Sequence, residues 1–468
     1  HMKKLLFFSS IIALLASCSS NYQSGELSGT QTRPVWSNEV PFGMLFIPQG
    51  SLNVGPSDQD VAWAQTAQNR TVSVQAFWMD ETEITNNEYR QFVDWVRDSL
   101  AYVTLKEDAG KDDLYVLVNE FGEDLEDDEQ YIDWSKPIDW NEAENREALL
   151  SFFLQGDERF YKRHELDVRR LNFTYYWMDF KQAAEKKKVN GKENRAYNYK
   201  TGKYEGTVLR ADGSRQEIKD RSSYIVKEEI NVYPDTLCWV SDYTYSYNDP
   251  MAAMYFWHPA YDHYPVVGVS WKQAVAFSIW RTQLKNGYLR SVKKVIVNDY
   301  RLPSETEWEY AARGGLESSP YPWGGNYTRN YLGCFIANFK PLRGNYTDDG
   351  GIQTVIVAHY EPNEWGLYDM AGNVAEWTQT AFDESAYSFT GDVNTDNYYS
   401  ALDDDPIVMK RKVVRGGSWK DIAYYMQCSS RTYEYQDSAK SYIGFRCVQT
   451  YLGRAYGSDG VQGESQVY

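Results

Sequence analysis

Few residues of this chain could carry metal or redox chemistry, since it holds five cysteines and five histidines among 468 residues. One histidine cluster stands out, formed by His258, Asp262 and His263. Its spacing is looser than that of typical zinc sites. We therefore interpret these three residues as surface residues of an aromatic loop.

Cys18 has a different setting, because it follows an apolar run at residues 5–16 that is too short to cross a hydrocarbon core of about 30 Å. The run ends in Leu-Ala-Ser-Cys18, which resembles a bacterial lipobox. The resemblance implies that residues 1–17 are a lipoprotein signal peptide and that Cys18 is lipidated. Residues 18–35 then form a flexible tether, and Ser19 favours the periplasmic face of the outer membrane. An ordinary cleaved secretory signal is the alternative.

Composition places the body of the chain among globular proteins. It is 42% hydrophobic and 16% aromatic, and its 66 acidic against 48 basic residues give a formal charge of −18. A strongly acidic surface repels phosphates, which argues against nucleic-acid binding. The length predicts two or three domains, and no segment after the leader has enough uninterrupted apolar residues to span a bilayer as a helix.

Three predicted helices begin with the same signature, a hydroxyl at the N-cap and Glu or Gln three residues later, which is a capping box. These pairs are Thr85 with Glu88, Ser270 with Gln273, and Ser304 with Glu307. In the first helix an i, i+3, i+4, i+7 stripe predicts one buried face, made of Tyr89, Phe92, Val93 and Val96. Gly287 and the Gly314–Gly315 pair are the predicted ends of the second and third helices.

Two stretches near the start predict strands. Residues 44–55 suggest a strand, a turn and a second strand, and the alternation of residues 71–79 predicts a further single strand.

Residues 101–256 are predicted to be a charged insertion or subdomain. Residues 101–150 hold 16 acidic and four basic side chains, whereas residues 151–230 hold 18 basic and 13 acidic side chains. Acidic runs of this kind are usually solvated, but opposite charges could also pair between subunits or bind cations. After the globular region, residues 453–468 are rich in Gly, Ser and Gln and are predicted to be a disordered tail.

Six segments carry a characteristic arrangement of Arg, Trp and Gly: Pro265–Trp271, Arg301–Gly315, Tyr321–Gly324, Asn363–Trp377, Val414–Trp419 and Gly444–Cys447. In this order they resemble the formylglycine-generating-enzyme (sulfatase-modifying-factor) family, with Glu83–Asn86 as an amino-terminal marker. The resemblance covers residues 36–100 and 257–452. It implies an α+β fold related to C-type lectins, low in regular secondary structure.

The family's enzymes oxidise a cysteine of a substrate peptide, using copper held by two thiolates shortly after the Arg-Gly-Gly-Ser motif. Here the first of these positions is Asp421, and the second falls on Ala423 or Met426. Neither thiol is present, so we expect a non-catalytic member without copper. The resemblance leaves a vestigial cleft, for which the expected residues are Arg415, Ser418, Trp419, Asp421 and Trp377.

The resemblance also implies two structural features. Cys428 and Cys447 would be half-cystines whose partners, near Ala312 and Ser278, are missing. Two calcium sites would use oxygen ligands. The first has Asn338, the Phe339 carbonyl and Asp349, and the second has Asn373, Glu376 and the carbonyls of Gly372 and Val374. Polar turn residues without metal are the alternative.

A second resemblance is to gliding-motility lipoproteins of the bacterial type IX secretion system. It rests on Cys18, residues 55–63, residues 77–92 and the charged insertion. It implies an outer-membrane lipoprotein that self-associates into a ring scaffold with a GldN/PorN-like periplasmic protein and serves protein transport. A copper-dependent oxidase with an altered site and a lectin-like glycan or peptide binder remain the alternatives.

Overall fold

The computed structural model describes residues 39–55, 69–118, 123–126, 130–159, 163–185, 187–189, 192–194, 197–210, 213–242, 249–341, 347, 350–392 and 394–453. The chain divides into two compact units, His1–Glu39 and Val40–Tyr468, and the second holds the elements below. The predicted signal peptide, Cys18 and the tether lie outside the described residues, as does the predicted tail beyond Gly453. Among the residues described, no helix combines the length and apolarity that crossing a membrane requires.

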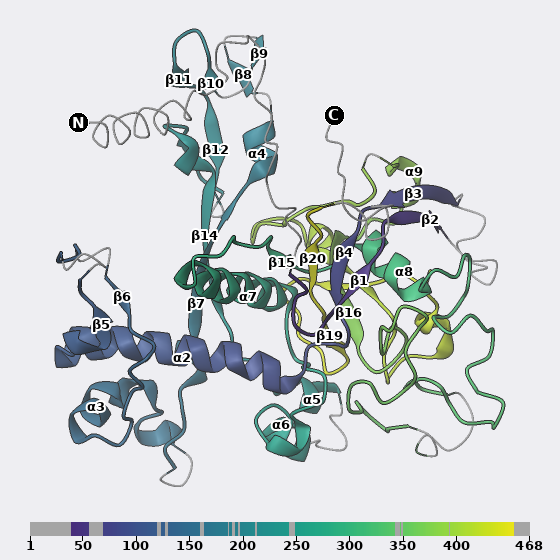
Figure 1. Cartoon of the computed structure of the whole chain (residues 1–468), viewed down its shortest axis with the longest axis horizontal. Coiled ribbons are helices and arrows are strands. Elements are labelled where there is room, and N and C mark those ends of the chain that lie inside the picture. Colours follow the sequence, from purple (N-terminus) through teal and green to yellow (C-terminus); the bar gives the residue numbers. More distant parts are fainter. Residues whose placement is uncertain are drawn as a thin grey trace, which may run out of the picture. The chain divides into compact units, whose positions relative to one another are not determined.

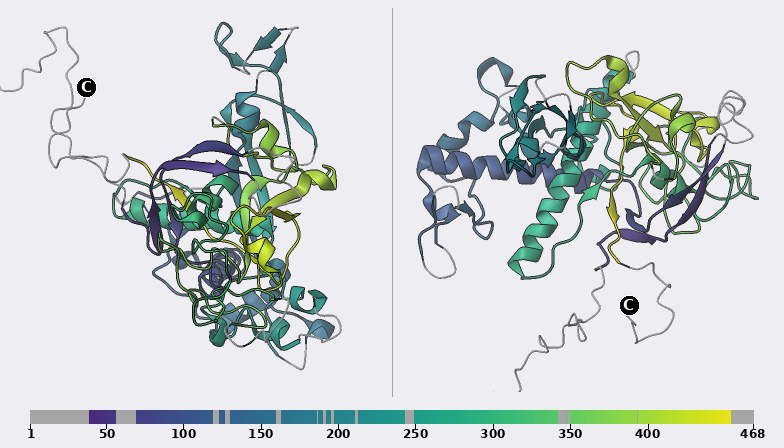
Figure 2. Two further views of the ribbon diagram at one scale, coloured as in Figure 1. Left: turned by 90° about the vertical axis from the view of Figure 1, so that its right-hand side faces the viewer. Right: turned by 90° about the horizontal axis from the view of Figure 1, so that it is seen from above.

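Two long helices, α2 (Asn86–Ala109) and α7 (Trp271–Ser291), lie beside one another, as Figures 1 and 2 show. All three predicted capping boxes are confirmed, at the starts of α2, α7 and α8 (Glu305–Arg313). The remaining helices are short: α3 (Ala143–Ala148), α4 (Phe180–Ala184), α5 (Cys238–Asp242), α6 (Asp249–Met254) and α9 (Ala386–Phe389).

Two four-stranded sheets lie on the same side of α2 and α7, to the right in Figure 1. The first has the order β1 (Met44–Ile47), β4 (Phe77–Asp80), β20 (Val448–Thr450) and β15 (Tyr300–Arg301), and its neighbours are antiparallel. The second has the order β18 (Thr432–Tyr435), β17 (Arg411–Arg415), β16 (Ala375–Ala381) and β19 (Ile443–Gly444), with β16 and β19 parallel. The α+β prediction is thus confirmed.

Six further strand pairs are antiparallel ribbons. They are β2 (Gly50–Val54) with β3 (Arg70–Val74), β5 (Tyr115–Val116) with β6 (Tyr131–Ile132), β7 (Asn172–Met178) with β14 (Ile225–Asn231), β8 (Lys187–Val189) with β9 (Lys192–Asn194), β10 (Tyr197–Asn198) with β11 (Lys203–Tyr204), and β12 (Thr207–Leu209) with β13 (Arg215–Glu217).

Two sequence predictions are corrected. The stretch 71–79 is not one strand, because β3 pairs with β2 whereas β4 pairs with β1 and β20, and the chain breaks between them. Gly287 does not end α7, which continues to Ser291 because Leu289 is buried and Asn286 exchanges two hydrogen bonds with Val297. Gly314 ends α8 as predicted, in the left-handed conformation with φ of 57°.

The main core combines the predicted stripe of α2 with aromatic residues of α7. Tyr89 stacks on Phe277 with ring centroids 5.5 Å apart, and both are buried. The predicted insertion contributes to this core through Phe173 and Tyr175 of β7 and through Val232. Its expected lower boundary, at residue 101, falls inside α2. Part of the charged segment therefore belongs to the same hydrophobic core as α2 and α7.

Candidate functional site

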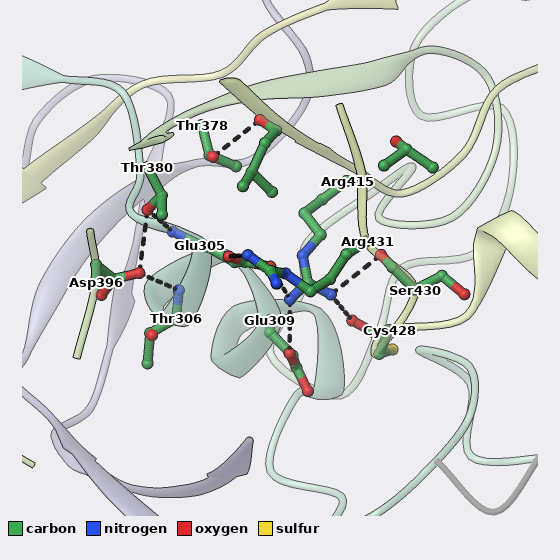
Figure 3. Close-up of polar contacts among 12 residues, drawn as sticks. Glu305, Thr306, Glu309, Thr378, Thr380, Asp396, Arg415, Cys428, Ser430 and Arg431 are labelled. Carbon is green, nitrogen blue, oxygen red and sulfur yellow. Dashed lines mark hydrogen bonds and ion pairs between the residues drawn. The ribbon is translucent and has the colours of Figure 1, made fainter. Parts of the chain in front are cut away.

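Arg415, at the end of β17, forms the centre of a buried ion network. Figure 3 shows its guanidinium between the carboxylates of α8 and the chain that follows β17. Nη2 lies 2.5 Å from Glu305 Oε1 and 3.0 Å from Glu309 Oε2, and Nη1 donates to the Cys428 and Ser430 carbonyls at 2.7 and 3.1 Å. Both Nη atoms of this predicted cleft residue are thus engaged by protein partners, whereas its buried Nε has no hydrogen-bond partner among the described residues.

A second arginine completes this network, since Arg431 Nε donates to Glu305 Oε1 at 2.5 Å. Burial acts to raise the pKa of Glu305, but the charges of Arg415 and Arg431 outweigh it and hold this pKa below its usual value. The carboxylate therefore stays ionised and structural.

The other predicted cleft residues lie in the interior as well. Trp377, Ser418 and Trp419 are buried, with indole Nε1 of Trp377 donating to the Val269 carbonyl at 2.9 Å and that of Trp419 to the Ser441 carbonyl at 3.2 Å. Trp419 also stacks on a second buried indole, Trp239, at 6.1 Å. These side chains serve packing and hydrogen bonding within the fold.

Asp421 stands where the family resemblance places the first catalytic thiolate. Ser418 Oγ donates to Asp421 Oδ2 at 2.6 Å, and burial raises the pKa of this carboxyl. At the two alternatives for the second position, Met426 is fully buried and Ala423 is partly buried. A hard carboxylate beside a hydroxyl is a poor ligand set for copper(I).

The four cysteines of the described chain, Cys238, Cys334, Cys428 and Cys447, are free thiols. Burial raises the pKa of both Cys428 and Cys447 to about 12, which keeps them protonated and unreactive near neutral pH. Ser278 Oγ lies 3.5 Å from Cys447 Sγ. The position near which the resemblance implies the partner of Cys447 therefore lies next to this thiol, while the pairing itself stays a prediction.

Glu376, predicted as a ligand of the second calcium site, is fully buried and already carries a cationic partner. Arg446 donates to both of its oxygens, from Nη2 to Oε1 at 2.6 Å and from Nε to Oε2 at 2.8 Å. Trp308 Nε1 donates to Oε2 at 2.7 Å. With its oxygens engaged in this way, Glu376 fits a calcium site poorly.

The predicted calcium residues Asn338 and Asn373 meet each other across two turns. Asn373 backbone N–H donates to the Asn338 carbonyl at 2.8 Å, and Asn373 Oδ1 accepts from Val355 N–H at 3.0 Å. Gly372 makes this approach possible, since a Cβ on it would lie 2.4 Å from the Asn338 carbonyl oxygen.

The three other residues predicted to bind calcium do not share one contact network. Phe339 packs edge-on against Phe335 with centroids 5.3 Å apart. Val374 N–H points to Glu83 Oε1 at 3.4 Å. Asp349 lies outside the described residues. Calcium binding therefore stays a prediction.

Sequence inspection did not reveal that Glu83 forms a buried acid pair with Asp369. Burial, followed by the charge of Asp369, raises the pKa of Glu83 well above its usual value, and burial also raises the pKa of Asp369. The family marker 83–86 identified Glu83, but Asp369 is 286 positions away and carried no signal of its own. This pair holds a proton at pH values where ordinary carboxyls are ionised.

The histidine cluster is not a metal site in the described part of the chain. No group of three or more metal-ligating side chains gathers among these residues. Asp262 forms an ion pair with Arg90, and His258 Nδ1 accepts a hydrogen bond from Ala260 N–H at 3.1 Å. The interpretation of these residues as a surface loop agrees with these contacts.

Comparison with known proteins defines the family. The model of the sulfatase-modifying factor enzyme 1-like domain matches residues 32–157 and 174–451, so this chain belongs to that family. The match includes much of the segment predicted to be an insertion, and the insertion's limits stay a prediction.

Among curated relatives, the inactive C-alpha-formylglycine-generating enzyme 2 of Bos taurus is 34% identical over 191 residues, which cover 40% of this chain and 50% of the relative. The formylglycine-generating enzyme of Streptomyces coelicolor is 33% identical over 190 residues, covering 40% of this chain and 52% of the relative. The chain thus spans about half the length of the curated relatives that it matches. Both inactive and active proteins occur among these relatives.

Among solved structures, PvdO from Pseudomonas aeruginosa is 16% identical with a TM-score of 0.42, over 90% of this chain and 99% of that one.

Proposed function

We propose that this protein is a non-catalytic member of its family that serves as a lipid-anchored assembly scaffold. One observation carries the proposal: the expected copper position holds the Asp421 carboxyl, hydrogen-bonded to Ser418, in place of a thiolate. Relatives described as inactive share about a third of the aligned residues, which is compatible with this role. A protein can keep the fold of an enzyme family without its catalytic activity, because that activity depends on particular site residues and not on the fold alone.

Within this role, the chain is proposed to be a GldK/PorK-type lipoprotein of the type IX secretion and gliding machinery, with the related GldJ as the neighbouring identity. Support comes from the lipobox ending at Cys18 and from residues 77–92. The proposed location is the periplasmic face of the outer membrane, with lipid attached at Cys18. The proposed partner is a GldN/PorN-like periplasmic protein, with which copies of this chain form a ring.

The test is to extract the full chain from membranes in detergent, together with the GldN/PorN-like protein, and to measure particle mass and image the particles. A large ring-shaped particle holding both proteins is expected. The matched variant Cys18→Ser, which removes the lipidation site, is expected to leave the membrane fraction. A monomer that binds no partner would disprove the scaffold role.

A peptide oxidation assay tests the alternative that the chain is an oxidase. The full chain is incubated with copper(I), oxygen and a cysteine-containing peptide, and the peptide mass is followed. No oxidised peptide and no tight copper uptake are expected. A peptide converted to formylglycine would establish the enzyme instead. A glycan array tests the lectin-like alternative in the same way, and we expect no binding.

A structural calcium ion remains proposed at the first predicted site, with Asn338, the Phe339 carbonyl and Asp349 as ligands. Asn338 Nδ2 donates to the Gln353 carbonyl at 2.8 Å, which leaves the amide oxygen of this side chain for a cation. Calcium titration followed by calorimetry tests the site, with Asp349→Asn as the variant expected to weaken binding.

A further inference from the structure

The outer face of the β7/β14 ribbon combines exposed apolar and cationic side chains. Met178 lies opposite Ile225, and Tyr176 lies opposite Lys227 in the antiparallel register. Tyr176, Met178 and Ile225 are 62%, 40% and 37% exposed, whereas Phe173 and Tyr175, which alternate with them on the inner side, are buried in the core. Such a stripe on a two-stranded ribbon is unusual for a surface that meets only water.

Cations lie on this stripe and beyond its Met178–Ile225 end. Lys181 follows β7 at the start of α4, and Arg221 precedes β14, and both are exposed, as is Lys227; Lys181 Nζ also lies 5.0 Å from the centroid of the Tyr399 ring. The neighbouring acids have local partners: Asp179 caps α4, Asp220 caps the 3-10 turn before β14, Glu228 accepts a hydrogen bond from Tyr175, and the exposed Glu229 accepts one from Asn172 Nδ2 at 3.3 Å. We call this surface the basic face, made of Tyr176, Met178, Ile225, Lys181, Arg221 and Lys227.

A second surface, at the end of α2, has the opposite charge. Val103 and Glu107 lie one helical turn apart, followed by Asp108, and Asp112 and Asp113 begin the next turn. All five are exposed, Val103 to 42%, and the four acids form no ion pair with a described cation.

Exposed aromatic side chains lie on β6 and just after it, and β6 pairs with β5, which directly follows the turn of Asp112 and Asp113. Tyr131 is 59% exposed, and Trp134 is 47% exposed and stacks on Trp95 at 5.5 Å. The lysines of this region are engaged at short range, Lys111 with Glu142 and Glu144 and Lys136 with Asp133. The acidic face is defined by Val103, Glu107, Asp108, Asp112, Asp113, Tyr131 and Trp134.

We propose that the acidic face of one copy of this chain docks on the basic face of a second copy. Each face offers apolar side chains for a desolvated centre and charges of one sign for a rim, which is the composition of a specific interface. The acidic face carries four carboxylates and the basic face three cations, so unlike faces attract each other when they meet. A like pairing, acidic face on acidic face, would instead be repelled.

The two faces occupy different places on the fold, which decides the type of assembly. Figure 1 shows the ends of β7 and β14 near α4 and β12, apart from the end of α2 that carries β5 and β6. A contact between unlike faces is heterologous, so each copy keeps one face available for the next copy. This inference rests on the proposed scaffold function and supplies the self-contact that a ring requires.

A charge-swap experiment on the full chain tests this contact. One variant reverses the basic face (Lys181→Glu, Arg221→Glu and Lys227→Glu), and another reverses the acidic face (Glu107→Lys, Asp108→Lys and Asp112→Lys). Sedimentation velocity at low and high salt measures assembly. The unmodified chain is expected to assemble at low salt and to dissociate as salt rises, because screening weakens exposed charge pairs.

Each reversal alone is expected to raise the concentration needed for assembly by about tenfold or more. An equimolar mixture of the two variants is expected to restore assembly, since both unlike contacts then become attractive again. The matched control reverses exposed charges outside both faces, Arg290→Glu with Glu361→Lys and Glu364→Lys, and should leave assembly unchanged. Circular dichroism confirms that each variant is folded.

The outcomes separate this inference from the proposed function. Assembly of the unmodified chain that neither reversal weakens, or a mixture that fails to recover, overturns the proposed contact and leaves the scaffold role standing. A chain that remains monomeric in every condition, including with its proposed partner and on lipid vesicles, overturns both.

Discussion

Ser278 Oγ lies 3.5 Å from Cys447 Sγ in the fully buried core, so a hydroxyl stands where the family resemblance implies a second half-cystine. The two residues belong to α7 and to the loop just before β20, 169 positions apart. The serine hydroxyl occupies the place beside the Cys447 thiol, which is free. The two side chains are therefore already close enough for a thiol at position 278 to face Cys447.

Ser278→Cys is expected to form a disulfide with Cys447. The new thiol would face Cys447, and oxidation would close a long loop and stabilise the native state by about 2–4 kcal/mol. Intact mass should fall by two hydrogens, and the melting temperature should rise only under oxidising conditions. Ser278→Ala provides the matched control and should show no redox dependence. Two titratable thiols in the oxidised native variant would contradict the prediction.

How much of the fold was predictable depends on the range of the interactions. The capping boxes at Thr85, Ser270 and Ser304 were predictable because both partners lie within one helical turn. The end of α7 was not, because Asn286 is held by Val297 in the following loop, and that contact overrides Gly287 as a helix end. Local sequence signals therefore predicted the starts of these helices more reliably than their ends.

In the candidate site, too, features set by nearby residues were predictable and features set by distant residues were not. The loss of a thiol at Asp421 can be read from one short motif. The partners of Glu376 and Arg415 could not be read in this way, because Arg446 is 70 positions from Glu376 and Glu309 is 106 positions from Arg415. A carboxylate that the sequence suggests as a metal ligand can therefore form an ion pair in the folded protein with an arginine far away in the sequence.

Removing the partner of Glu376 should be costly. Arg446→Gln leaves a buried carboxylate without its guanidinium, which is expected to destabilise the protein by about 3–5 kcal/mol. Chemical denaturation measures this loss, and added calcium should not reverse it, because Glu376 fits a calcium site poorly. Lys420→Gln is the control, since the Lys420 side chain in its ion pair with Asp242 is 40% exposed and the pair should contribute at most about 1 kcal/mol. Rescue of Arg446→Gln by calcium would show that Glu376 can bind this metal.

The Glu83–Asp369 pair should make stability depend on pH. Burial raises the pKa of Glu83 in the folded state, so the native form binds this proton more tightly than the unfolded chain does. Stability from this group is present below the unfolded pKa and is lost as the pH rises through the folded pKa. Glu83→Gln, which stays neutral, should remove this decline, so its stability relative to the unmodified chain should rise between pH 4 and pH 8.

Thermal melts of Glu83→Gln and the unmodified chain across this range test the expectation. Glu317→Gln, a carboxyl on the exposed turn after α8, serves as the control and should track the unmodified chain. Parallel curves for Glu83→Gln and the unmodified chain would mean that Glu83 titrates normally.

Lys412 should give a pH dependence of its own. It is fully buried on β17, where Nζ donates to the Tyr399 carbonyl at 2.6 Å and lies 3.7 Å from the centroid of the Trp271 ring. Burial lowers the pKa of this amine to about 7. The unfolded chain, with a lysine pKa near 10.4, therefore binds the proton more tightly than the native state does. Stability from this group is present above the unfolded pKa and is lost as the pH falls towards 7.

Lys412→Met keeps the length of the side chain but removes the charge, so its stability relative to the unmodified chain should rise as the pH falls from about 10 to 7 and then level off. A gain of about 2–4 kcal/mol over this interval is expected, on top of a constant loss from the missing contacts with Tyr399 and Trp271. Urea unfolding at several pH values measures the difference. Lys410→Met, two residues earlier and partly exposed, should show no such trend. A pH-independent difference for Lys412→Met would mean that the buried amine stays charged, held by the indole face and the carbonyl.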